Sequence, residues 1–170
     1  MAIDIRSAKI DDLPNVFHLG EDLFTSQEYS NLYRTWDEFE VTGLFQSDPD
    51  LCLVAWDVDE QRLAGFLFST TYQKAGSAWS YGHITWLGID HAYNRKGIGR
   101  GLFDAIIKIM KKRGIRMLIV DTQADNEPAI AFFNRMGFSQ ATEHVYMSMN
   151  LENWNRIQQD DSAKKKRKQT

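Results

Sequence analysis

The sequence predicts an α/β (α+β) domain built on a mixed sheet, and three features of the chain predict it. Two apolar, strand-like runs, 51–57 and 63–71, are joined by a short polar segment, which is typical of an antiparallel hairpin. Further on, a strand-like run at 82–90 is followed by a glycine-rich turn, an amphipathic helix over 98–113 and another apolar run at 117–121. A strand, helix and strand in this order make neighbouring strands parallel. No internal repeat is visible. We therefore expect antiparallel pairing early in the chain and parallel pairing between the fourth and fifth strands.

The N-terminal part is expected to contain one strand and two helices. Residues 2–8 read as the first strand, and Asp11, Asp12 and Pro14 are typical of the start of a helix. The aromatic and acidic stretch 29–45 predicts a second helix with a loop, closed by a turn at Asp48, Pro49 and Asp50. The apolar stripe of the first helix is Val16, Phe17, Leu19, Leu23 and Phe24.

The C-terminal part supplies the remaining elements. Residues 72–80 read as a polar loop, and Gly114 is placed to end the helix over 98–113. A third helical segment is expected between Asp125 and Gly137, and strands at 138–142 and 145–151 finish a domain over residues 1–151. Residues 152–170 are polar and end in a run of cations, so we expect a disordered tail, with a nuclear import patch or an electrostatic tether to RNA or ribosomes as alternatives. That run is Lys164, Lys165, Lys166, Arg167 and Lys168.

Composition indicates a soluble globular protein and excludes several classes. At 170 residues the chain fits one domain, and its net charge of −3 makes a nucleic-acid partner unlikely, since such proteins usually carry a strongly basic face. Cys52 is the single cysteine and lies in an apolar run, so no internal disulfide is possible and a buried inert thiol is expected. Neither a signal peptide nor an apolar run of ~20 residues is present, so we expect a cytoplasmic protein without membrane contact.

The most informative segment is Tyr93–Gly101, which places three glycines and three cations between a strand and a helix. Glycine removes the Cβ atoms that keep a phosphate away from backbone N–H groups, and the following helix directs unpaired N–H groups and its positive dipole end to the same spot. The spacing matches neither a Walker A loop nor a dinucleotide fingerprint. The segment therefore predicts a cradle for a pyrophosphate, the alternative being a simple connection with solvated cations.

Three stretches of the chain carry a resemblance to a known family. They are Ile5–Leu13, the glycine loop Tyr93–Phe103, and Asn126–Phe133 followed by Met136, Gly137 and Phe138. Over about residues 3–150 the chain resembles the GNAT acyltransferase superfamily, closest to its ribosomal-protein and N-terminal acetyltransferase branch. The resemblance implies the GNAT fold, a mostly antiparallel seven-stranded sheet with splayed parallel strands four and five and about four helices.

The resemblance also implies acetyl-CoA as co-substrate and assigns residues to it. The family's loop pattern puts Gln or Arg where this chain has Asn94, so some phosphate contact is expected to pass to nearby cations. The pantetheine arm is expected to lie between the splayed strands, where a backbone N–H also stabilises the oxyanion. Asn126 matches the family's cofactor-contacting asparagine, with a helix cap as the alternative or additional role. The implied cofactor-binding set is Leu87, Gly88, Ile89, Asn94, Arg95, Lys96, Gly97, Ile98, Gly99, Arg100, Asn126, Ala129 and Phe133.

For the chemistry, direct attack of an amine on a thioester needs a base, and an acid for the departing thiolate. Asp121, at the end of the fifth strand, and His83, at the start of the fourth, are the candidate bases, each with a structural role as the alternative. Many family members use a tyrosine acid where this chain has Phe133. Tyr146, with Tyr81 or Tyr93 as further candidates, is expected to take that role unless the thiolate leaves unaided. No metal site is expected, because no second ligand cluster accompanies the histidines.

The sequence therefore predicts an N-acetyltransferase that passes acetyl directly to a primary amine, with a protein N-terminus as the first acceptor hypothesis. A polyamine or other small amine is the second, and a noncatalytic acyl-CoA-binding regulator is the rival from another class. An acidic group in residues 21–40 is expected either to attract a cationic amine or to be a solvated helix face. A monomer or a homodimer is expected. The acidic group is Glu21, Asp22, Glu28, Asp37, Glu38 and Glu40.

Overall fold

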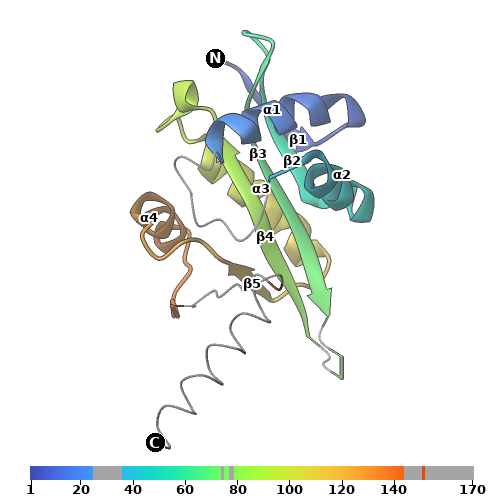
Figure 1. Cartoon of the computed structure of the whole chain (residues 1–170), viewed down its shortest axis with the longest axis vertical. Helices are drawn as coiled ribbons and strands as arrows, with labels where there is room; N and C mark the ends of the chain where they lie inside the picture. Colours follow the sequence, from blue (N-terminus) through green and yellow to red (C-terminus); the bar gives the residue numbers. More distant parts are fainter. Residues whose placement is uncertain (25–35, 74, 77–78, 144–150, 152–170) are drawn as a thin grey trace, which may run out of the picture.

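The computed structural model describes residues 1–24, 36–73, 75–76, 79–143 and 151. Five strands form one sheet in the order β1-β2-β3-β4-β5 within these residues, antiparallel from β1 to β4 and parallel between β4 and β5 (Figure 1). The mixed sheet and its parallel pair confirm the predicted fold class. The strands are β1 Ile3–Ser7, β2 Cys52–Asp57, β3 Arg62–Gln73, β4 Ser80–Ile89 and β5 Met117–Val120.

The helices follow the predicted order with small shifts at their ends. In the described part of the aromatic and acidic stretch a helix begins at Glu38, where Asp37 caps it by accepting the backbone N–H of Glu40 at 2.7 Å; residues 29–35 lie outside the described residues. Gly114 follows the long helix with φ +76°, as its predicted role requires. The α-helices are α1 Leu13–Leu23, α2 Glu38–Ser47, α3 Ile98–Lys112 and α4 Glu127–Arg135; short 3₁₀ turns are η1 Ile10–Asp12, η2 Pro49–Leu51 and η3 His91–Tyr93.

Two predictions about the strands are wrong. Residues 138–142 are not a strand, because Gln140 has φ +60° and breaks the extended backbone there. The described residues form five strands, and the expected total of seven is not shown in them. The second error is at the β3–β4 hairpin, where Tyr72 and Gln73 belong to β3 and Ser80 begins β4, so the predicted loop 72–80 is shorter. The predicted strand 145–151, except for Leu151, and the tail 152–170 lie outside the described residues.

Helices cover both faces of the sheet, and each face has its own apolar core. The helices α1 and α2 lie over one face, and α3 packs against the other (Figure 1). The core under α3 includes Leu102 and Ile106, while the core under α1 and α2 includes Val16 and Phe68. The helix α4 lies beside β4 and β5 (Figure 1). The sheet is thus the middle of a three-layer arrangement.

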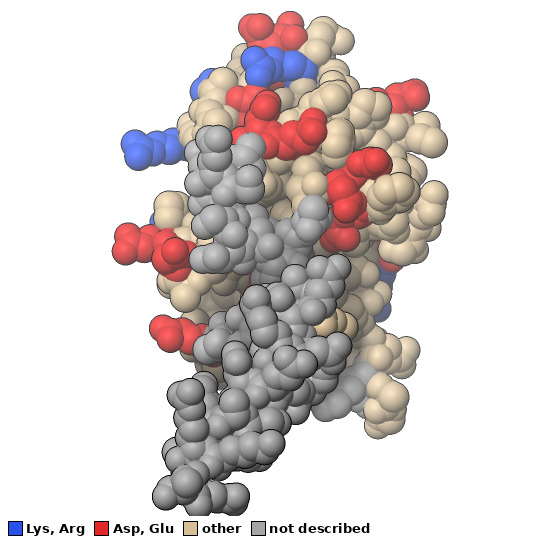
Figure 2. All heavy atoms as spheres, viewed as in Figure 1, with Lys and Arg blue, Asp and Glu red and all other residues tan. Residues whose placement is uncertain are grey.

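The outer surface of α1 and α2 is acidic, as the composition of that segment predicted. Figure 2 shows carboxylates on the face of the molecule that carries these two helices. Glu21, Asp22 and Glu38 are exposed, whereas Glu40 is half-buried and accepts the indole N–H of Trp86 at 3.0 Å. Glu28 lies outside the described residues.

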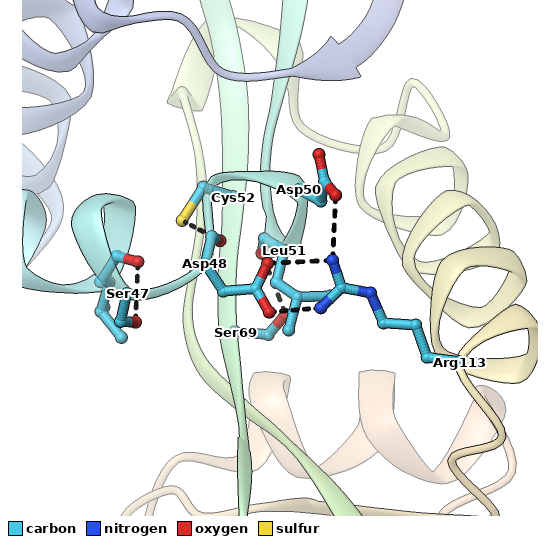
Figure 3. A network of polar contacts seen from close by, with 8 residues as sticks. Ser47, Asp48, Asp50, Leu51, Cys52, Ser69 and Arg113 are labelled. Atoms are coloured by element: carbon cyan, nitrogen blue, oxygen red, sulfur yellow. Dashed lines mark hydrogen bonds and ion pairs between the residues drawn. The ribbon is translucent and has the colours of Figure 1, made fainter.

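The C-terminal end of α3 is tied to the other side of the molecule by Arg113 (Figure 3). Its guanidinium donates to both carboxylate oxygens of Asp48, and it also donates to Asp50 at 3.0 Å. Two donors matched to one carboxylate hold the position of both partners better than a single contact does.

Beside this clamp lies Cys52. Burial raises the pKa of its thiol to about 12, so the thiol is the inert group that the sequence predicted.

The N-terminal end of the fold depends on a buried carboxylate. Asp12 accepts two hydrogen bonds from the Arg6 guanidinium, at 2.6 and 2.9 Å, and a third from the backbone N–H of Lys9. Its side chain is 8% exposed, and the bonds from Arg6 hold the pKa of Asp12 below its ordinary value. This pair joins β1 to the start of α1.

We expect Asp12→Asn to destabilise the protein by roughly 2–3 kcal/mol at neutral pH, since it leaves Arg6 partly buried without its counter-charge. A carboxyl whose pKa is lowered by folding stabilises the protein above its unfolded pKa, and that stabilisation is lost as the pH falls through the folded pKa. The difference between variant and parent should therefore shrink in acid. Urea unfolding at neutral and acid pH measures this, with the exposed neighbour Asp11→Asn as the control expected to change little. Equal stability of the Asp12 variant and the parent at neutral pH would contradict the assignment.

Gly88 in β4 is required by close packing. A Cβ at this position would lie 2.7 Å from Cε1 of Phe66 and 2.9 Å from Cδ1 of Leu23. We expect Gly88→Ala to destabilise the protein by about 1–3 kcal/mol through overpacking. The matched control is Gly43→Ala on the exposed side of α2, where a Cβ meets nothing within 4 Å and a gain of about 0.5–1 kcal/mol is expected. Thermal unfolding of both variants is the measurement, and opposite signs are the expected result.

Candidate active site

The site begins with one extra residue in β4. The register of the β3–β4 pair shifts between Phe68 and Ser69, which face Trp86 and Ile84, so that Thr85 is the additional residue of a β-bulge. The pairing of β4 with β5 ends at the same place, with Ile84 opposite Val120. Bulges bend a strand and increase its twist. Beyond Ile84 the described part of β4 therefore pairs with β3 alone, and β4 and β5 separate.

Two of the residues predicted to be catalytic meet where the strands separate. His83 lies on β4 just before the bulge, and Asp121 directly follows β5. The Nε2 atom of His83 is 2.6 Å from Oδ1 of Asp121. The imidazole is only 4% exposed, whereas the Asp121 side chain is 40% exposed. The structure thus joins a buried histidine to a carboxylate that reaches solvent.

A third group, which the sequence analysis did not single out, completes this arrangement. The hydroxyl of Tyr72, near the end of β3, is 3.2 Å from Nδ1 of His83, and the two rings lie 5.4 Å apart. Both ring nitrogens of His83 therefore have polar partners. A carboxylate only accepts hydrogen bonds, so in the neutral imidazole Nε2 carries the hydrogen and Nδ1 accepts from the Tyr72 hydroxyl.

Burial affects the acid–base chemistry of Asp121. Partial removal from water raises its pKa above the ordinary value of an aspartate, and a hydrogen bond from its own backbone opposes that shift. Val120 and Leu118 pack into the core under α3, so strand alternation directs Asp121 to the other face of the sheet, where it meets His83. The three polar groups therefore lie on the side of the sheet that α3 does not cover.

The glycine loop has the geometry that an anion cradle requires. Gly97 is the N-cap of α3 with φ +83°, and nothing lies within 4 Å of the position where a Cβ would stand. Arg95 also adopts the left-handed conformation, at φ +61°. The first N–H groups of an α-helix have no acceptor within it, so those at the start of α3 point toward this open space. Ile98 is buried and fixes the helix start beside the sheet.

A buried hydrogen bond of Tyr93 holds this loop in place, and two of its cations have partners within the protein. Tyr93 is 4% exposed and donates its hydroxyl to Asp57 at 3.0 Å. The Lys96 ammonium lies 4.8 Å from the centroid of the Tyr93 ring, a cation–π distance, and its backbone N–H donates to the Tyr93 carbonyl. Arg100 forms an ion pair with Asp104 one turn along α3. Of the residues predicted to hold phosphate, Lys96 and Arg100 thus have partners within the protein, and Asn94 and Arg95 are exposed.

The other predicted cofactor residues lie along β4 and α4. Leu87 and Ile89 are on the part of β4 that no longer pairs with β5, and Gly99 packs near Phe132. Asn126 caps α4 by accepting the backbone N–H of Ala129 at 3.2 Å, the alternative role that the sequence offered, and it donates to Thr122. Phe133 is 9% exposed and packs edge-on against Phe132 and Phe138. Ala129 is half-buried beside the same core.

The tyrosines considered as the acid have different positions. Tyr93 donates to Asp57, which pairs with Arg62, while His83 pairs with Thr70 further along β3. The eight residue steps from Arg62 to Thr70 span about 26 Å of strand, so Tyr93 lies far from His83. Tyr81 is half-buried and pairs with Tyr72 across the hairpin. Tyr146 lies outside the described residues.

The described residues show neither a metal-binding cluster nor a membrane-spanning helix. They contain no group of three or more His, Cys, Asp or Glu side chains placed to hold a metal ion. Among the helices that the structure describes, none combines the length and the hydropathy needed to span a bilayer.

Three sequence relatives share parts of the chain. N-alpha-acetyltransferase 30 of Schizosaccharomyces pombe is 33% identical over 53% of this chain and 58% of its own length. The [ribosomal protein bS18]-alanine N-acetyltransferase of Escherichia coli K12 is 38% identical over 33% of this chain and 38% of its own. Mycothiol acetyltransferase of Corynebacterium aurimucosum is 30% identical over 57% of this chain and 33% of its own. The chain thus spans between a third and three fifths of the relatives it matches, and their acceptors differ.

The fold is shared with solved structures. The structure of the NatC complex bound to Gag peptide and CoA includes a chain that aligns with a TM-score of 0.69 at 18% identity, over 84% of this chain and 87% of that one. At this identity the likeness concerns the fold alone. The model of the acetyltransferase (GNAT) family matches residues 13–138, well over half of the chain. Enzymes of that family use acetyl-CoA as co-substrate. The chain therefore belongs to the acetyltransferase (GNAT) family, as the glycine loop and the separating strands indicated.

Proposed function

We propose that this protein is an N-acetyltransferase that passes acetyl directly from acetyl-CoA to a primary amine, with a protein N-terminus as the preferred acceptor. The observation that carries the proposal is the contact of His83 with Asp121 at the point where β4 and β5 stop pairing. A base at this point can accept the proton of an amine that attacks a thioester held between the strands.

In the proposed reaction the neutral amine nitrogen forms a bond to the thioester carbon, and the bond from that carbon to sulfur breaks. The amine nitrogen gives a proton to the base, and the CoA thiolate takes one from solvent, since Phe133 offers none. The products are the acetamide and CoA, and no bond to the protein forms at any stage. His83 holds the proton, and Asp121 stabilises the imidazolium that results.

The cofactor is proposed to enter along β4. The glycine loop at the start of α3 takes the pyrophosphate through backbone N–H groups, with the exposed Asn94 and Arg95 beside it. The arm that carries the thioester follows Leu87 and Ile89 toward His83. From Ile89 to His83 the strand spans about 20 Å, so an extended arm is needed to join the two parts of the site.

The choice of acceptor rests on the names of two relatives and on charge. N-alpha-acetyltransferase 30 and the ribosomal-protein enzyme are named for protein acceptors. The carboxylates on α1 and α2 give the corresponding face a negative potential, which attracts a cationic amine (Figure 2). A third relative is named mycothiol acetyltransferase, so a small amine remains the second candidate acceptor.

An acceptor screen tests this choice. Acetyl-CoA is incubated with peptides that carry a free N-terminus, with the same peptides blocked at the N-terminus but carrying lysine, and with polyamines. Thiol release and mass spectrometry identify the product. Modification of free N-termini alone supports the proposal, and preference for polyamines supports the second candidate. Acetyl-CoA binding without transfer to any amine would make the protein a noncatalytic acyl-CoA-binding regulator.

We expect His83→Gln to lower kcat by about 10²–10³-fold, within the usual contribution of a general base. Asp121→Asn should also lower it, because the amide no longer stabilises the imidazolium. Activity of the parent protein should fall as the pH drops through the raised pKa of Asp121, since protonation removes its charge. Asp125→Asn, which changes an exposed carboxylate in the same loop, is the control expected to keep parental activity. Unchanged kcat in both the His83 and Asp121 variants would disprove the base assignment.

We expect Gly97→Ala to weaken acetyl-CoA binding by about five- to tenfold, because a Cβ enters the cradle and the left-handed backbone disfavours it. Gly114→Ala is the matched control, since Gly114 flanks the other end of α3 with φ +76° and open space around it. Both variants should lose similar stability, about 1 kcal/mol, but only the first should lose affinity. Calorimetric titration with acetyl-CoA and thermal unfolding separate the two effects. Equal affinities in the two variants would place the pyrophosphate elsewhere.

A further inference from the structure

We propose that Tyr72 is a catalytic residue, whose hydroxyl contacts the acceptor amine and passes its proton to His83. This inference rests on the proposed function and assigns a further residue to the same site.

A substrate has better access to Tyr72 and Asp121 than to His83. The His83 ring is 4% exposed, so an incoming amine has little room to reach it. Tyr72 is 49% exposed and Asp121 is 40% exposed at its side chain, so these two are the members of the trio that a substrate can touch. Tyr72 approaches the imidazole from β3, and Asp121 approaches it from beyond β5.

The hydrogen bonds of the His83 ring have definite directions. The Asp121 carboxylate can only accept, so it faces the N–H of Nε2, and the basic lone pair of His83 lies on Nδ1. Nδ1 faces the Tyr72 hydroxyl at 3.2 Å. The lone pair that has to receive the amine proton is therefore directed at Tyr72 and away from Asp121.

The proton transfers through Tyr72 and His83 balance. When the amine nitrogen gives its proton to the Tyr72 oxygen, the hydroxyl hydrogen moves to Nδ1 of His83. The hydroxyl is restored, the imidazole becomes an imidazolium, and Asp121 holds its Nε2–H. The tyrosine therefore ends each transfer neutral, because it gives up one proton as it takes up another. The imidazolium later loses its extra proton to solvent.

The trio lies on the face of the sheet that α3 does not cover. Tyr72, Thr70 and His83 share one face, because Thr70 pairs with His83 and side chains alternate along β3. This is the face that α3 leaves free, and the acidic helices α1 and α2 lie over the same side of the sheet. An amine drawn to those carboxylates thus approaches the trio from the side on which Tyr72 is exposed.

The test is Tyr72→Phe, which keeps the ring and removes the hydroxyl. We expect kcat to fall by about 10²-fold while the KM for acetyl-CoA stays unchanged, because the glycine loop lies at the other end of β4. Thr71→Val is the matched control, since it removes a hydroxyl from the adjacent residue of β3, whose side chain is on the opposite face. The control should keep parental kcat. Parental kcat in the Tyr72 variant, with activity lost in His83→Gln, would overturn this inference and leave the proposed function intact.

A second measurement does not depend on turnover. Nitrogen NMR of the parent protein should show His83 with its hydrogen on Nε2, and Tyr72→Phe should shift the Nδ1 resonance toward that of an imidazole nitrogen without a hydrogen-bond donor. A hydrogen on Nδ1 in the parent, or no change of Nδ1 in the variant, would overturn the relay even if no acceptor had been found. Absence of acetyl transfer by the parent protein, with these NMR results as expected, would instead contradict the proposed function.

Discussion

The site depends on one extra residue in a central strand. Side chains alternate along a strand, so two residues three positions apart normally face opposite sides of the sheet. In β4, however, Ile84 and Leu87 both pack toward α3, and Trp86 packs under α1 and α2. The bulge at Thr85 makes this possible because it resets the alternation. It also coincides with the last pair of β4 and β5, so a single insertion both opens the sheet and sets the face on which His83 stands.

Burial of a histidine at this point has a structural cost that its partners offset. An imidazole removed from water destabilises a protein unless its nitrogens are hydrogen-bonded. Tyr72 and Asp121 meet that requirement from different strands, so the trio also joins β3, β4 and the end of β5. The same contacts fix the tautomer and orientation of the ring. The stability of this part of the sheet and the proposed chemistry therefore depend on the same three side chains.

Local patterns in the sequence predicted much of this molecule. The glycine loop, the helix from Ile98 and the cap at Asn126 follow from residues adjacent in the chain, where turn and cap chemistry is explicit. The approach of His83 to Asp121 could be anticipated only as two separate candidates, since it depends on the parallel register of β4 and β5. Tyr72 was missed because the polar stretch after Thr71 reads as a loop, and only the hairpin register shows that β3 continues through it.

Other details depend on contacts between distant residues, which a single sequence does not reveal. Lys96 and Arg100 read as phosphate ligands, but Lys96 lies over the Tyr93 ring and Arg100 pairs with Asp104. Their charges still contribute to the field of the loop, while the backbone N–H groups at the start of α3 remain directed at its open side. The predicted strand at 138–142 failed for a local reason, the left-handed backbone of Gln140, which glutamine itself does not signal.

The separate cores on the two faces of the sheet have an evolutionary consequence. The glycine loop and α3 are anchored through one core and through the Arg113 clamp (Figure 3), whereas α1 and α2 rest on the other core. Substitutions in the second core can accumulate with little effect on the first, since distant sites without shared partners contribute almost independently to stability. With the acceptor approaching over α1 and α2, as proposed, a lineage with this architecture can diversify the molecules it modifies while inheriting its acyl donor unchanged.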